Sequence, residues 1–254
     1  MATKRKKYVF RSGDIIDVEE YHNGRYGAPG MPRQKKKKVT KEQMVQINLL
    51  NKARKAKRKM LAYMNFGDYF ATWTYAEEKR PEDMKAALRD FQKAMRKVRK
   101  EYQKRGYELY WFRNIERGTR GGWHVHLVIN RIPGTASILE EAWEHGGTYS
   151  TSIRKSKFYD EDFTKLANYM TKNENSVVHR ADGSRAKSRI KEASYWTSKN
   201  MPLLDPQEDK LVRWQEEPKP KKGYYIVKES FYEGVAATGY KYRRYTMIRL
   251  HRRI

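Results

Sequence analysis

The chain contains no cysteine. This absence excludes disulfide bonds, thiolate nucleophiles and every zinc site built on cysteine sulfur. A metal ion would have to be held by histidine, by carboxylates or by neutral oxygen atoms. A covalent nucleophile would have to come from a hydroxyl, phenol, amine, carboxylate or imidazole group.

Acidic residues are also scarce, with 30 Asp and Glu against 56 Lys and Arg, and the net charge is +26. Such a charge favours a polyanionic partner, because each phosphate that is neutralised releases a condensed counterion. No apolar run approaches the roughly 20 residues of a transmembrane helix, and the start MATKRKKYVF has no signal-peptide pattern. We therefore expect a cytoplasmic protein of a bacterial host cell that binds no membrane.

No G-x-x-x-x-G-K-[ST] run is present, which excludes an ATP-driven helicase of the P-loop kind within this sequence. The 19 tyrosines are many for so polar a chain. Aromatic and basic residues that alternate are typical of proteins that bind single strands, since bases stack on rings and phosphates meet cations.

The most basic part of the sequence is residues 1–62, which we interpret as a basic N-terminal arm. Between Arg33 and Lys59 there are twelve Lys or Arg residues and one acid, Glu42. Such a run is either a solvated surface or a phosphate-binding arm, and the basic remainder of the chain favours phosphate binding. The predicted DNA-binding residues are Arg33, Lys35, Lys36, Lys37, Lys38, Arg54, Lys55, Lys57, Arg58 and Lys59.

Periodicity then predicts a domain over residues 63–200 and a basic, aromatic extension over 201–254. The expected elements are a strand at 69–76, a helix at 81–105, strands at 108–116 and 123–132, a short helix at 137–143, a strand at 146–153, a helix at 159–173 and two C-terminal strands after residue 223. This order indicates an α+β fold with a ferredoxin-like or RRM-like antiparallel sheet.

Two of the six histidines stand one residue apart in the run WHVHLVIN, at His124 and His126. Side chains alternate along a strand, so both imidazoles share one face while Val125 and Leu127 share the other. A hairpin that turns at Arg120 places Glu116 directly opposite His124, on the imidazole face. Two histidines and one carboxylate are the donor set of a catalytic metal site, although an H-x-H pair alone is more often structural. A register slip of one residue would remove Glu116 from the set.

The predicted helix at 159–173, with Asp160 as its expected N-cap, carries a tyrosine away from its apolar stripe. Tyr169 projects about 110° from that stripe, and Lys172 follows three residues later. In a chain with many tyrosines this pattern is usually a surface feature. Beside a metal it describes a phenol that can be activated as a nucleophile against phosphate.

These motifs together resemble the His-hydrophobic-His (HUH) endonucleases, specifically the rolling-circle replication initiator proteins of bacterial plasmids and phages. The matching segments are YFATWTY, HVH with Glu116, YMTK and, more loosely, SYWTSKNMP. The resemblance implies that Glu116, His124 and His126 hold Mg²⁺ or Mn²⁺. It also implies that Tyr169 attacks a single-stranded origin hairpin to give a 5′-phosphotyrosyl link and a 3′-OH primer, and that Lys172 orients the phosphate. The host would supply helicase and polymerase.

Two alternatives stay open at this point. A single-tyrosine transposase or a relaxase would keep the chemistry, although a relaxase usually has its tyrosine ahead of the histidine motif. A non-catalytic RRM-like nucleic-acid-binding protein would keep the sheet, but its central strands should carry stacking aromatic residues rather than histidines.

Overall fold

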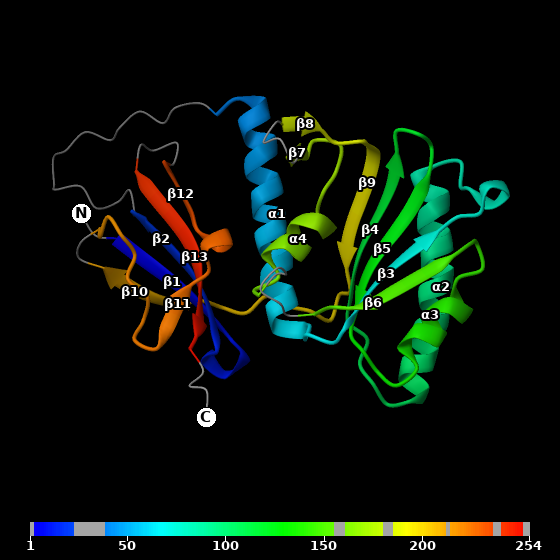
Figure 1. Cartoon of the computed structure of the whole chain (residues 1–254), viewed down its shortest axis with the longest axis horizontal. Coiled ribbons are helices and arrows are strands. Elements are labelled where there is room, and N and C mark those ends of the chain that lie inside the picture. Colours follow the sequence, from blue (N-terminus) through cyan, green and yellow to red (C-terminus); the bar gives the residue numbers. More distant parts are fainter. Residues whose placement is uncertain are drawn as a thin grey trace.

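A computed structural model describes residues 3–22, 39–154, 161–179, 185–211, 214–235 and 240–250. The architecture is α+β, as expected, with four α-helices and antiparallel strand pairing throughout these residues (Figure 1). Two sheets lie on either side of a central pair of helices, and a second pair of helices covers the far face of one sheet. No helix among the described residues is long and apolar enough to cross a membrane.

The first sheet has five strands in the order β6-β3-β5-β4-β9. Their bounds are β3 Tyr69–Thr74, β4 Trp111–Gly118, β5 Trp123–Ile129, β6 Thr148–Ser152 and β9 Ile190–Thr197. Counted from β3, the strand order is fourth, first, third, second, followed by β9. This is the predicted ferredoxin-like arrangement with one additional edge strand.

Helices α2 (Met84–Lys104) and α3 (Thr135–Ala142) cover one face of this sheet. The α2 helix begins three residues later than Pro81, because the Asp83 side chain accepts a hydrogen bond from the Ala86 amide and so caps the first turn. The apolar stripe of α2 packs on alternate residues of the strands, among them Ile115 and Val125. The opposite face of the sheet is left for Glu116, His124 and His126.

The second sheet joins segments from both ends of the described chain, in the order β10-β1-β2-β13-β11, with β12 also paired to β13. Its strands are β1 Thr3–Phe10, β2 Ile15–His22, β10 Gln207–Leu211, β11 Tyr224–Ile226, β12 Tyr232–Val235 and β13 Lys241–Arg249. Thr3–His22 is thus a hairpin within a sheet and not part of a basic arm. The two expected C-terminal strands are three, because a 3₁₀ turn at Lys228–Ser230 interrupts the first, and they stay outside the first sheet.

Helices α1 (Lys41–Tyr63) and α4 (Thr164–Met170) lie between the two sheets (Figure 1). The α1 helix begins at a capping box formed by Thr40 and Gln43. One apolar core links all of these layers, from Phe10 and Ile248 through Met60 to Phe112. The remaining elements are the small hairpin of β7 (Val177–His179) and β8 (Arg185–Lys187) and 3₁₀ turns at Arg11–Gly13 and Glu77–Lys79.

The basic residues at the end of α1 face the second sheet and are not a free cationic surface. Lys57 lies between Asp17 and Asp162, at 3.3 and 2.8 Å, and is almost fully buried. Arg58 is equally buried and forms an ion pair with Asp17 at 2.7 Å. The prediction that Lys57 and Arg58 bind DNA is therefore wrong, because their charges are already neutralised within the protein.

The other predicted DNA-binding residues differ among themselves. Arg54 forms an ion pair with Glu19, and Lys59 donates to Thr197 Oγ1 at 3.1 Å. Lys55 is exposed, and its DNA-binding role stays a prediction. Arg33 and Lys35–Lys38 lie outside the described residues, as does Asp160.

Candidate active site

The hairpin of β4 and β5 has the register that the sequence predicts. Glu116 pairs with His124, and Asn114 pairs with His126. The turn between the strands is tight because Gly121 adopts a φ of +81°, which L-residues with a side chain rarely take. Glu116, His124 and His126 therefore share one face of the first sheet, on the side of α4.

The Glu116 carboxylate and the His126 imidazole are in direct contact, with Oε1 and Nε2 2.8 Å apart. His126 Nδ1 lies 3.1 Å from the hydroxyl of Thr72, its partner on β3. The His124 ring is parallel to that of His126, with centroids 6.2 Å apart. Burial lowers the pKa of His124, and the nearby His126 lowers it further. A neutral His124 is the form that can donate a lone pair to a metal ion.

Lys172 follows α4 and extends toward the same carboxylate, with Nζ 3.2 Å from Glu116 Oε1. Its backbone carbonyl accepts a hydrogen bond from the Asn114 amide, which fixes the end of the helix against β4. Burial opposes ionisation of Glu116, but His126 and Lys172 outweigh it and lower the pKa of Glu116. The carboxylate is therefore ionised at neutral pH.

Tyr169 points from α4 toward the histidines. Its hydroxyl lies 3.2 Å from His126 Nε2, and its ring meets the Phe70 ring edge-on. Lys172 Nζ lies 3.9 Å from the centroid of the Tyr169 ring. Burial raises the pKa of Tyr169, and Lys172 counteracts part of that increase. With 39% of its surface exposed, Tyr169 is still accessible from solvent.

The entry into α4 is unusual and fixes where Tyr169 lies. Phe163, the N-cap, is fully buried and has a φ of +60°, in the left-handed region. Asp162 accepts a hydrogen bond from the Thr164 amide at 3.2 Å and pairs with Lys57 of α1. The helix is consequently shorter than the predicted 159–173, and the second sheet holds its beginning through α1.

The predicted metal ligands do not form a ready ion site. Within the described parts of the chain, no group of three or more His, Asp and Glu side chains is arranged to hold a metal ion. The reason is that Glu116 Oε1 is already in contact with His126 and Lys172. The donor types nevertheless suit Mg²⁺ or Mn²⁺, and Glu116 Oε2 is buried without a hydrogen-bond partner among the described residues.

Three residues of the site were not singled out from the sequence. Thr72 contacts His126 Nδ1, Asn114 fixes the end of α4, and Phe70 stacks on the His126 ring at 5.9 Å. Their signal was present in the alternation of YFATWT, which places Phe70 and Thr72 on one face. It could be used only once β3 was known to pair with β5.

The fold and the site define an α+β domain in which a tyrosine, two histidines, a glutamate and a lysine meet on one face of a ferredoxin-like sheet. Residues 68–174, which contain all five side chains, match the family model of the replication-associated protein ORF2. This match confirms the predicted resemblance at the level of the family and is consistent with a rolling-circle replication initiator. No curated protein and no solved structure matches the chain significantly.

Proposed function

We propose that the protein nicks and rejoins single-stranded DNA at a replication origin by transesterification, with Tyr169 as the nucleophile. The observation that carries the proposal is the placement of the Tyr169 hydroxyl 3.2 Å from His126, beside Glu116 and Lys172. The family match supports a role in replication, because it covers this whole cluster. An exposed phenol beside an imidazole and an ammonium group is suited to attack on a phosphodiester.

In this reaction the Tyr169 oxygen bonds to the scissile phosphorus and the bond to the 3′ oxygen breaks. The phenol gives up its proton, and the departing oxygen takes one up to become a 3′-OH that primes synthesis. The products are a 5′-phosphotyrosyl link and that primer. Tyr169 needs help to ionise, since burial raises its pKa above the phenol value of about 10.

Lys172 supplies part of this help. Its ammonium group lies against the Tyr169 ring and lowers the pKa of the phenol, which opposes the effect of burial. The same charge can bind a phosphate oxygen, because Lys172 is only half-buried. Lys172 would therefore hold the phosphate and favour the phenolate.

Glu116, His124 and His126 would hold Mg²⁺ or Mn²⁺. Such an ion, when bound, polarises a non-bridging phosphate oxygen and stabilises the charge that gathers there. Glu116 is ionised and His124 is neutral, as ligands must be. Lys172 would then exchange its contact with Glu116 for one with the phosphate. Binding of Mn²⁺ to the wild type but not to His124→Ala, followed by calorimetry without DNA, tests this assignment.

The wider role follows from the same proposal. The substrate would be a single-stranded origin hairpin in the cytoplasm of a bacterial host, with helicase and polymerase supplied by that host. Since the motif offers one tyrosine, closing the replicated circle would need a second protomer or another nucleophile.

The test is a covalent adduct. The protein is incubated with labelled origin-bearing single-stranded DNA and Mn²⁺, and complexes that survive boiling in SDS are counted. Wild type and the control Tyr149→Phe should form the adduct, because Tyr149 is an exposed tyrosine on the edge strand β6 and lies outside α4. Tyr169→Phe should form none. An adduct in Tyr169→Phe would contradict the proposal.

A second candidate is a non-catalytic nucleic-acid-binding protein, which the ferredoxin-like strand order and the charge of +26 favour. Tight DNA binding by the wild type with no adduct on any origin-bearing strand would support this alternative.

A further inference from the structure

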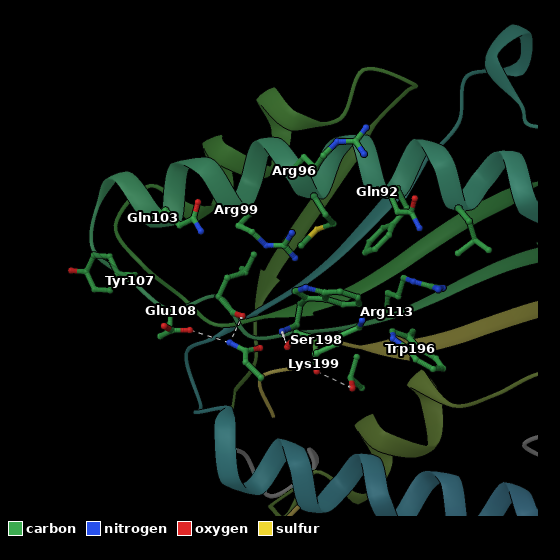
Figure 2. A pocket seen from close by; sticks show the side chains of 17 residues that line it. Gln92, Arg96, Arg99, Gln103, Tyr107, Glu108, Arg113, Trp196, Ser198 and Lys199 are labelled. Carbon is green, nitrogen blue, oxygen red and sulfur yellow. Dashed lines mark hydrogen bonds between the residues drawn. The ribbon is translucent and has the colours of Figure 1, made fainter. Parts of the chain in front are cut away.

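A pocket of about 850 Å³ lies between α2 and the strands β4 and β9 (Figure 2). It belongs to the face of the first sheet opposite the histidines, because its wall residue Arg113 alternates with Asn114 on β4. One wall is α2 and the other is β9 with the residues that follow it; the labelled side chains on these walls are Gln92, Arg96, Arg99, Gln103, Trp196, Ser198 and Lys199. The Tyr169 site does not use this pocket.

The lining is strongly cationic. Arg96, Arg99, Arg113 and Lys199 line the pocket together with a single carboxylate, that of Glu108. Glu108 accepts a hydrogen bond from Asn200 at 3.0 Å. Within the described part of the chain, Arg96, Arg99 and Lys199 have no ion pair or hydrogen bond through their side chains. Three cations are thus free to meet an anion.

Arg113 adds a buried positive charge that no carboxylate of the described residues neutralises. Only 7% of its surface is exposed, and its Nη1 donates to the backbone oxygen of Ser194 at 2.7 Å. Its guanidinium lies 5.2 Å from the centroid of the Phe91 ring. Burial lowers the pKa of Arg113 to about 10. Since an unpaired buried charge is costly, an anion in the pocket would stabilise this side chain.

Trp196 provides an aromatic surface beside these charges. It pairs with Arg113 across the β4–β9 ladder, so both side chains lie on the pocket face. Its indole is 59% exposed, which is high for the largest apolar side chain. Guanidinium groups beside an exposed ring form the usual binding site for a phosphate and an unstacked base.

We infer that this pocket binds a nucleotide of single-stranded DNA, with its phosphate among Arg96, Arg99 and Arg113 and its base against Trp196. The choice of DNA rests on the proposed function, and the match to replication-associated proteins covers both α2 and β4. A single strand is required, because a paired base cannot stack on the indole. DNA held here flanks the nicking site and adds affinity without entering the chemistry.

The test measures DNA affinity without cleavage. All variants carry Tyr169→Phe, and binding of a labelled mixed-sequence 30-nucleotide strand is followed by fluorescence anisotropy without divalent ions. Trp196→Ala should raise Kd about tenfold, the size of one base stacked on a ring. Arg96→Gln with Arg99→Gln should weaken binding and make the dependence of log Kd on log salt shallower by roughly 1.4, about 0.7 for each phosphate that is no longer neutralised.

The matched control is Arg89→Gln with Lys100→Gln, which removes two cations of α2 that do not line the pocket. This control should leave Kd within about twofold of the parent. An unchanged Kd in both pocket variants, or an equal loss of affinity in the control, overturns the inference. Preference for RNA of the same sequence, with the loss confined to RNA, also overturns it.

The proposed function is judged separately. In the background that keeps Tyr169, the pocket variants should form the covalent adduct at the wild-type level when DNA is saturating. If no variant forms an adduct while the pocket variants still lose affinity, the nicking proposal fails and the nucleotide-binding pocket stands.

Discussion

Replacing Lys57 by methionine should destabilise the protein strongly without weakening its binding to DNA. The ammonium group lies 2.8 Å from Asp162 and 3.3 Å from Asp17 and is nearly inaccessible to water. Methionine keeps most of the volume but leaves two carboxylates facing each other in the interior. Removing one partner of a buried ion pair costs about 3–5 kcal/mol, so we expect a loss of that size in the free energy of unfolding.

The measurement is urea denaturation at pH 7, with Lys55→Met as the control on the exposed side of α1. Lys55→Met should stay within about 0.5 kcal/mol of wild type. Adding Asp162→Asn to Lys57→Met should recover part of the loss, since one unpaired carboxylate is removed. Wild-type stability together with weaker DNA binding in Lys57→Met would refute the buried ion pair and restore a DNA-binding role.

The pH dependence of stability gives this prediction a second readout. Burial opposes ionisation of Asp17 and Asp162, but Lys57 outweighs it and the pKa of both carboxyls is lowered. A lowered pKa stabilises the folded state above the unfolded value of about 3.9, and this contribution is lost as the pH falls further. Wild type should therefore lose stability below about pH 4, and Lys57→Met should lose less over that interval.

Further predictions concern the site and the first sheet. Lys172→Met should raise the pKa of Tyr169, so the rate of adduct formation should fall about 100-fold at pH 7 and recover partly at higher pH; a pH profile parallel to that of the control Lys165→Met would contradict this. Gly146→Ala should lower the free energy of unfolding by about 1–3 kcal/mol, because its Cβ would lie closer than 3.0 Å to the backbone of Thr74, Tyr75 and Ala76. Gly122→Ala, whose Cβ would make only ordinary contacts, should be tolerated in the same denaturation experiment.

The sequence was sufficient to predict the first sheet and the core of the site, because both depend on local signals. The alternation in WHVHLVIN and the glycine-rich turn define the β4–β5 register, and this register alone places Glu116 opposite His124. Helical periodicity indicated correctly that Tyr169 projects away from the packed stripe. Thr72 and Phe70 join the site only through the pairing of β3 with β5, which is not a local signal.

The second sheet could not be predicted, since it pairs strands that lie more than 200 residues apart, such as Ile15–His22 with Lys241–Arg249. The same limitation explains the error at Lys57 and Arg58. A run of lysine and arginine looks like a surface when its partners, Asp17 and Asp162, come from distant segments. The left-handed conformation of Phe163 shortened α4 for a similar reason, because a buried phenylalanine gives no sign of a helix start.

Mass spectrometry of the protein–DNA adduct tests the central claim most directly. The adduct is trimmed with nuclease, digested with protease, and searched for the peptide that carries a nucleotide through a phosphate ester. The account predicts this mass on the peptide that contains Tyr169, with fragment ions that locate it on the phenol oxygen. A nucleotide on Tyr149 or on any other residue, with Tyr169 unmodified, would contradict it.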